Sequence, residues 1–125
     1  MDLNQVTVPA TDIVRSIGFY RTLGLRLIVE APHYARFECP EGTTTFSIHA
    51  VDRAPAGEGI AVYFECAALD QQVADLQQKG ISFDELPNDK PWLWREAHLR
   101  DPDGNRLILF HAADNRKNPP WRLPH

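Results

Sequence analysis

The stretch Ser16-Ile17-Gly18-Phe19-Tyr20-Arg21-Thr22-Leu23-Gly24-Leu25, with the run Gln5-Val6-Thr7-Val8 before it, decides the fold. Its pattern recurs 56 residues further along the chain. Apolar residues stand at alternate positions, then at helical intervals, and a glycine follows where a helix would stop. The matched pairs are Val6 with Val62, Val8 with Phe64, Ile13 with Leu69, Ile17 with Val73, Tyr20 with Leu76, Gly24 with Gly80 and Leu25 with Ile81.

After each glycine the pattern predicts three more extended segments: 26–30, 34–38 and 43–49 in the first copy, and 82–86, 92–100 and 105–111 in the second. Asp101-Pro102-Asp103-Gly104-Asn105 is typical of a tight turn. Thr11 or Asp12 is expected to cap the first helix, and Asp70 to open the second. We therefore predict an α+β chain, with 1–125 as a single domain. It comprises βαβββ modules at 3–51 and 59–112, a linker at 52–59 and a C-terminal arm at 113–125.

Charge and composition narrow the class of partner. Thirteen basic and seventeen acidic residues give a formal charge of −4, and Arg116-Lys117 is the longest basic run. These features argue against nucleic acid or a membrane surface as partner and favour a small molecule or another protein. The two cysteines, Cys39 and Cys66, have no disulfide or zinc-binding spacing. Without a signal peptide or an apolar run long enough to cross a bilayer, a cytoplasmic protein is expected.

Two motifs carry a resemblance to a known family. The opening run through Leu25, and the closing Arg100-Asp101-Pro102-Asp103-Gly104-Asn105-Arg106-Leu107, resemble the modules of the vicinal-oxygen-chelate superfamily, which includes glyoxalases, bleomycin-resistance proteins and extradiol dioxygenases. The resemblance implies that two modules form a cupped, half-open barrel, which holds a divalent metal in the enzymes. The motifs serve helix packing and a turn, so they identify a fold rather than a reaction.

The resemblance also implies where metal ligands would stand. Carried over position by position, the four ligand sites fall on Gln5, Ser47, Ala61 and Ile108. Gln5 fits the family pattern, whereas a serine hydroxyl binds divalent ions weakly and the other two side chains have no donor atoms. We therefore expect no metal at the usual position and no cofactor, which puts glyoxalase and dioxygenase chemistry in doubt.

The alternation of the strands predicts a polar and aromatic face on each module, opposite the helix-packed face. The candidate ligand-binding residues on it are Gln5, Ser47, His49, Tyr63, Glu65, Trp92, Trp94, His98, Arg106 and Phe110. The candidate catalytic or displaced metal-binding residues are His49, Glu65, Glu96 and His98, whose other interpretation is a hydrogen-bonded polar lining. Trp92 and Trp94 either clamp a planar ligand or seal a sheet edge or a dimer interface.

Three function classes follow from these features. The first is a metal-free protein that binds a flat organic ligand, neutral or cationic, as the bleomycin-resistance branch of the superfamily binds its ligand without chemistry. The second is an enzyme, a lyase, isomerase or dioxygenase relative, with a rebuilt metal or acid-base centre. A structural or interaction module is a third, less favoured class. If Arg106 points at the ligand, an anion would be preferred instead. We also expect a homodimer, with module pairing within one chain or across the dimer left open.

Overall fold

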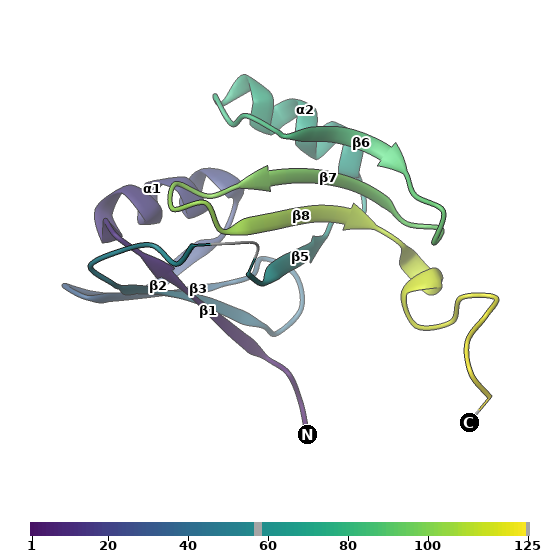
Figure 1. The fold of residues 1–125 in the computed structure, drawn as a ribbon, viewed down its shortest axis with the longest axis horizontal. Helices are drawn as coiled ribbons and strands as arrows, with labels where there is room; N and C mark the ends of the chain where they lie inside the picture. The colour runs from purple at the N-terminus through teal and green to yellow at the C-terminus, as the bar shows by residue number, and fades with distance from the viewer. Residues whose placement is uncertain (57–58, 125) are drawn as a thin grey trace. The chain divides into compact units, whose positions relative to one another are not determined.

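A computed structural model describes residues 1–56 and 59–124 (Figure 1). The chain divides into two compact units. Unit 1 comprises Met1–Gly59 with the turn Asp101–Asn105, and unit 2 comprises Ile60–Arg100 with Arg106–His125. Residues 57 and 58 of the expected linker, and residue 125 of the expected arm, lie outside the described residues.

Unit 1 contains one helix and one four-stranded mixed sheet. Its elements are β1 (Gln5–Ala10), α1 (Ile13–Leu23), β2 (Arg26–Ala31), β3 (Tyr34–Glu38) and β4 (Thr45–Ala50). The strand order is β1-β4-β3-β2. β1 runs parallel to β4, while the other neighbours are antiparallel.

Unit 2 repeats this plan. Its elements are β5 (Ala61–Glu65), α2 (Leu69–Gln78), β6 (Glu85–Asp89), β7 (Arg95–Arg100) and β8 (Arg106–His111), followed by the short 3-10 helix η1 (Ala113–Arg116). The strand order β5-β8-β7-β6, with β5 parallel to β8, is that of unit 1. The predicted α+β fold of two βαβββ modules is confirmed.

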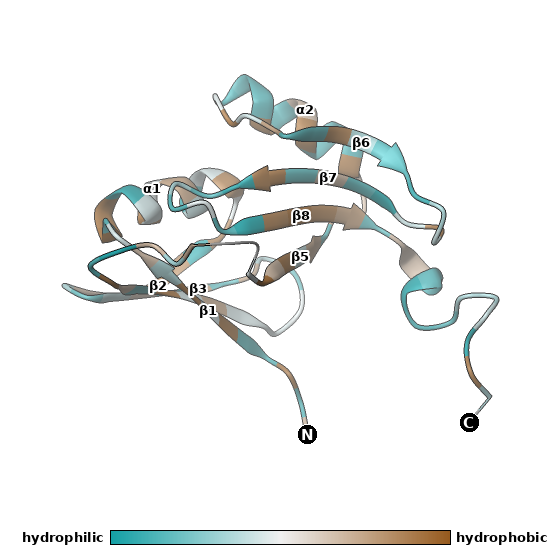
Figure 2. Cartoon of the chain, viewed as in Figure 1, coloured by the Kyte–Doolittle hydropathy of each residue, from teal (hydrophilic) through white to brown (hydrophobic). Residues whose placement is uncertain are grey.

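Each helix packs one apolar stripe on its sheet. In α1, Asp12 caps the first turn by accepting a hydrogen bond from Arg15 N at 3.1 Å, and Gly24 ends the helix with φ 114°. Tyr20 lies fully buried between α1 and the sheet, with its ring centroid 4.6 Å from that of Phe46. Figure 2 shows hydrophobic and hydrophilic residues on both helices. The core of each unit lies between the helix and one face of the sheet.

The core of unit 2 follows the same rule. The buried residues of α2 and of the facing strands are apolar: Leu69, Val73, Leu76, Leu99, Leu107 and Leu109. No hydrogen bond from a side chain caps α2, and Asp70 lies in its first turn, where it pairs with Arg95 at 2.9 Å. No helix in the described part of the chain is long and apolar enough to cross a membrane.

Two strands of unit 2 begin later than the sequence pattern predicts. β6 begins at Glu85 instead of residue 82, and β7 begins at Arg95 instead of residue 92. For β7 the reason is a turn in which Leu93 N donates to Lys90 O at 3.0 Å and Lys90 N donates to Trp94 O at 2.7 Å. Leu93 has φ 68°, a left-handed conformation that a strand does not allow. Trp92 therefore lies within a turn and Trp94 follows it, so neither opens a strand.

Candidate functional site

Unit 2 presents a face, here called the aromatic face, on the side of its sheet opposite the buried leucines. The register places Glu96 opposite Phe110, and His98 opposite Ile108. It also places Ile108 opposite Tyr63. Alternation along each strand gives the face its members: Ala61, Tyr63, Glu65, Trp94, Glu96, His98, Arg106, Ile108 and Phe110. Eight of these nine residues lie on three adjacent strands, so a single molecule can contact several of them.

Three rings form the centre of the aromatic face. Trp94 and Phe110 are stacked, with centroids 4.6 Å apart and planes 18° from parallel. Tyr63 stands edge-on to both, at 5.8 Å from Trp94 and 5.6 Å from Phe110. Phe110 is buried, whereas Tyr63 is 47% exposed. Trp94 and Phe110 already stack on each other, so a planar ligand would contact the outer surface of the cluster rather than enter between these two rings.

A buried carboxylate lies beside these rings. Glu96 is 1% exposed, and its Oε2 accepts a hydrogen bond of 2.7 Å from Trp92 Nε1. Its Oε1 lies 2.8 Å from His98 Nε2. Trp92, although 46% exposed, is thus tied to the face by its indole N–H. The two contacts satisfy the carboxylate and fix the orientation of the imidazole.

His98 also lies near a second carboxylate. Its Nε2 is 3.9 Å from Glu85 Oε2. Glu85 in turn contacts the Lys90 ammonium and the Asn88 amide, and the hydrogen bond from Lys90 holds the pKa of Glu85 below its usual value. Both carboxylates approach the same ring nitrogen, and the one within hydrogen-bond distance, Glu96, can share a proton with it.

Glu65, a candidate base, is engaged elsewhere. Its Oε2 accepts hydrogen bonds from the backbone N–H groups of Ala112, at 2.7 Å, and Ala113, at 2.8 Å. Arg116 Nε lies 3.7 Å from Oε1. Ala113 has φ 48°, an uncommon conformation for a residue with a side chain. The carboxylate therefore anchors the start of η1, a contact that the spacing of the sequence did not indicate.

The positions that the family resemblance assigns to metal ligands have other roles. Gln5 accepts a hydrogen bond from the Thr45 hydroxyl at 2.8 Å, and the buried Ser47 hydroxyl lies 2.6 Å from that of Thr7. Ala61 and Ile108 are packed in one apolar cluster with Phe110, Ala112 and Trp94. Across residues 1–56 and 59–124, no three His, Cys, Asp or Glu side chains converge as metal ligands would. This donor set does not fit a divalent ion.

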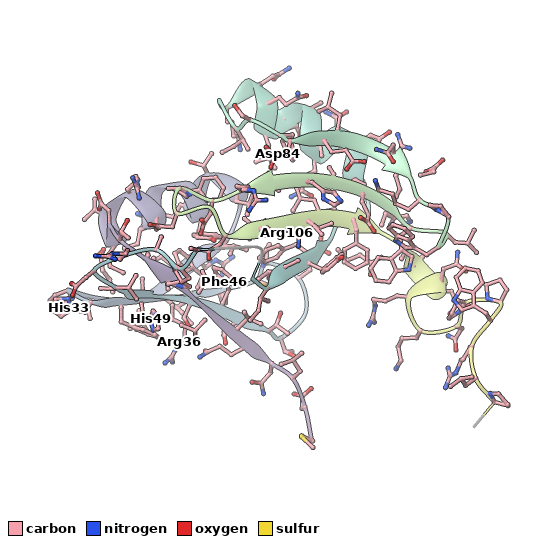
Figure 3. The ribbon with its side chains drawn as sticks, in the orientation of Figure 1. His33, Arg36, Phe46, His49, Asp84 and Arg106 are labelled. Atoms are coloured by element: carbon pink, nitrogen blue, oxygen red, sulfur yellow. The ribbon has the colours of Figure 1, made fainter. Side chains whose placement is uncertain are left out.

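Unit 1 presents a second face, here called the polar face, on the side of its sheet opposite Phe37 and Phe46. Its members are Gln5, Thr7, Tyr34, Arg36, Ser47 and His49, from β1, β3 and β4. Figure 3 labels Arg36 and His49 on the same side of the first sheet. Of the four candidate catalytic residues, His49 thus lies in unit 1 and the other three lie in unit 2, where Glu96 and His98 are in contact.

The sequence analysis missed Tyr34 and Arg36. Polar and apolar residues alternate along Tyr34–Glu38 in the sequence, so the alternation that selected Ser47 and His49 would also have selected Tyr34 and Arg36. Arg36 Nε donates a hydrogen bond of 2.9 Å to Tyr34 Oη. These two residues are opposite Ser47 and His49 in the register, so they complete the polar face.

Comparison with known proteins places the chain in a family. The model of the Glyoxalase/Bleomycin resistance protein/Dioxygenase superfamily matches residues 2–109. The Bacillus subtilis protein YraH is 29% identical to this chain, and the match covers 88% of this chain and 98% of YraH. A superfamily structure from Nocardioides has TM-score 0.75 and 24% identity, covering 90% of this chain and 83% of its own. The bleomycin resistance determinant encoded on transposon Tn5 also has TM-score 0.75, with 19% identity and coverage of 89% and 98%. This chain belongs to the glyoxalase/bleomycin resistance protein/dioxygenase superfamily.

Proposed function

We propose that this member of the superfamily binds a small, flat organic molecule on the aromatic face, without a resident divalent metal. The observation that carries the proposal is the stack of Trp94 on Phe110, with Tyr63 edge-on and half exposed beside it. Exposed aromatic surface is costly in water, and a planar ligand that covers it gains both apolar burial and ring contacts. A bleomycin resistance determinant shares this fold, so ligand binding is within the range of functions the fold supports.

The chemistry of the donor set supports the metal-independent part of the proposal. Ala61 and Ile108 offer no donor atoms, and Ile108 is 1% exposed within an apolar cluster. A cation placed there would lose hydration without gaining ligands. The energy of binding is therefore expected to come from rings and hydrogen bonds.

The two carboxylates on the aromatic face give little preference for a cationic ligand. Glu96 already accepts hydrogen bonds from Trp92 and His98, and Glu65 accepts two from the backbone. Carboxylates satisfied in this way do not need a ligand cation for compensation. The preference for cations expected from their charge alone is thereby weakened, and neutral aromatic compounds are the first to test.

The test is a fluorescence titration, since Trp92 and Trp94 both flank the face. Neutral aromatic compounds that do not absorb where tryptophan is excited, such as benzyl alcohol and benzamide, are compared with cyclohexanol, which has no π electrons. Trp121→Phe removes the exposed indole of the C-terminal arm and serves as the control. We expect saturable quenching by the aromatic compounds in the native chain and in Trp121→Phe, and about tenfold weaker binding in Trp94→Ala. Equal binding of cyclohexanol, or no effect of Trp94→Ala, would contradict the proposal.

The contact between Glu96 and His98 supports a second candidate, an acid-base enzyme such as an isomerase or lyase. Glu96 orients the imidazole through Nε2 and leaves Nδ1 for a ligand on the neighbouring rings. For a ligand with an acidic C–H, His98 would remove the proton and return one from solvent. Deuterium exchange into the ligand, followed by NMR and abolished in His98→Gln, would favour this candidate. Binding without deuterium exchange would favour the first candidate, a protein that only binds its ligand.

We also propose that the chain forms a homodimer. The C-terminal arm carries two large apolar side chains exposed in the single chain, Trp121 at 57% and Leu123 at 69%. A second copy could bury them, and closed two-fold dimers are the commonest assembly of soluble chains. Light scattering at micromolar concentration should report twice the mass of one chain. A monomer that keeps full thermal stability would contradict this part.

A further inference from the structure

Arg36 lies on the polar face of unit 1, where none of the described residues pairs with it as a carboxylate partner. The neighbouring carboxylate on its own strand, Glu38, instead pairs with Arg26 at 3.0 Å. Within the described ranges 1–56 and 59–124, Arg36 forms no ion pair at 4.0 Å or less. The side chain is also partly buried. A partly buried guanidinium loses some of its hydration, and an anion would restore favourable interactions.

The surroundings of Arg36 hold this cation in place. Its Nε donates to Tyr34 Oη at 2.9 Å, and its guanidinium carbon lies 5.4 Å from the centroid of the Tyr34 ring. Ser47, opposite Arg36 in the register, shares a short hydrogen bond of 2.6 Å with Thr7. Nε is engaged, and among residues 1–56 and 59–124 no hydrogen bond uses the two terminal nitrogens of the guanidinium, which can therefore bind a ligand.

Tyr34 is part of the same network. Hydrogen bonds with Ser47 and then with Arg36 and Gln5 lower the pKa of Tyr34 below its usual value. Such a shift means that these neighbours stabilise negative charge at the position of the phenol oxygen. The polar face is therefore suited to an oxyanion in its geometry and in its electrostatics.

We propose that Arg36, held by Tyr34 and flanked by Ser47, binds the oxyanion of a small organic acid or phosphate on the polar face. The planar fork of a guanidinium matches two oxygens of a carboxylate or a phosphate. This inference goes beyond the proposed function, because it assigns a second recognition surface, in unit 1, with a ligand class of its own.

The test is a titration of the ¹⁵N-labelled full chain followed by NMR, with benzoate and inorganic phosphate as separate probes. Ionic strength is held constant with chloride. We expect saturable shifts of the amide signals of Tyr34, Arg36, Ser47 and His49. Binding of benzoate but not phosphate would identify the ligand as a carboxylic acid. Binding of phosphate but not benzoate would identify it as a phosphate compound.

The matched variants are Arg36→Gln and Arg26→Gln. Arg26 lies in the same sheet but is already paired with Glu38, so its replacement should leave the affinity unchanged. Arg36→Gln should weaken binding about tenfold or more. If that variant does not give a folded spectrum, Arg36→Lys keeps the charge, loses the fork and should weaken binding several-fold.

Shifts that do not saturate would overturn the inference. So would equal affinity of the native chain and the folded Arg36 variant, or a loss of affinity in Arg26→Gln equal to that in the Arg36 variant. The result is independent of the aromatic face. The NMR experiment follows amide signals of unit 1, whereas all three tryptophans, Trp92, Trp94 and Trp121, belong to unit 2, so the two experiments follow different residues. Failure of one proposal is therefore distinguishable from failure of the other.

Discussion

Tyr20 Oη donates a hydrogen bond of 2.6 Å to Oδ2 of Asp101, a residue 81 positions further along the chain. The other oxygen of Asp101 accepts from the backbone N–H groups of Asp103 and Asn105, both at 2.9 Å. The tight turn 101–105 is thereby fastened to α1. The two motifs that the sequence displays separately, one in the first helix and one in the turn, are parts of one hydrogen-bonded structure in unit 1.

Replacing Tyr20 tests this connection. Tyr20 is fully buried, so Tyr20→Phe keeps the ring but leaves Asp101 with one donor fewer in a site closed to water. We expect a loss of about 1–3 kcal/mol in the free energy of unfolding. Urea denaturation measures it, with Tyr63→Phe as the control because Tyr63 is half exposed. Equal stability of the two variants would show that the Tyr20 hydroxyl contributes nothing.

The same contact predicts an alkaline limit to stability. Burial and then the charge of Asp101 raise the pKa of Tyr20 far above its usual value. The neutral phenol therefore contributes stability that is fully present below pH of about 10, where a tyrosine of the unfolded chain ionises, and is lost as pH rises further. Tyr34, whose pKa is lowered, should ionise first. In Tyr34→Phe the titration followed by absorbance should lose its earliest ionisation step. In Tyr20→Phe the free energy of unfolding should fall less steeply with rising pH than in the native chain.

Periodicity was sufficient to predict the fold, because each helix and most strands bury one side. The repeat from Val6 to Gly24 and from Val62 to Gly80 follows from that requirement alone. The late start of β7 was not predictable in this way. Trp92 and Trp94 have strand-like spacing, but Leu93 adopts a left-handed turn whose hydrogen bonds depend on Lys90. Local backbone chemistry thus outweighed the pattern.

The candidate site was predictable in its residue types and faces, but not in its pairings. The alternation of side chains along each strand placed Glu65, Glu96 and His98 on one face. It does not show which of these side chains are in contact. The contact of Glu96 with His98 follows from their spacing of two residues on one strand. The contact of Glu65 with Ala112 and Ala113 requires the chain to turn after β8, where φ of Ala113 is positive.

The anchoring role of Glu65 gives a third prediction. Glu65→Ala removes the acceptor of two backbone N–H groups at the start of η1, so the arm that follows should open more often. Trypsin should then cut faster after Arg116 and Lys117. Glu38→Ala, which breaks an exposed ion pair in unit 1, is the control and should leave the rate unchanged. An unchanged rate in Glu65→Ala would mean that other contacts hold the arm.

Metal addition gives a fourth prediction. Because Ala61 and Ile108 provide no donor atoms, Zn²⁺, Ni²⁺ or Mn²⁺ should leave the melting temperature of chelator-treated protein nearly unchanged. A metal present at about a hundred times its dissociation constant would add about 2.7 kcal/mol to the free energy of unfolding. A rise of that size, reversed by chelator, would show that other side chains form a metal site and would contradict the metal-independent proposal.

Trp92 and Trp94, two residues apart, should respond differently to the same substitution. Trp92 donates its indole N–H to the buried carboxylate of Glu96 at 2.7 Å, whereas Trp94 stacks its ring on Phe110. Trp92→Phe keeps an aromatic ring but removes a donor to a charged acceptor, which costs about 1.5–3 kcal/mol. Trp94→Phe keeps a stacking ring and loses only part of its area, so it should cost about 1 kcal/mol. Urea denaturation of both variants measures the difference. Equal losses would mean that the N–H of Trp92 is replaced by water without cost, and that Glu96 is accessible to solvent and not a buried centre.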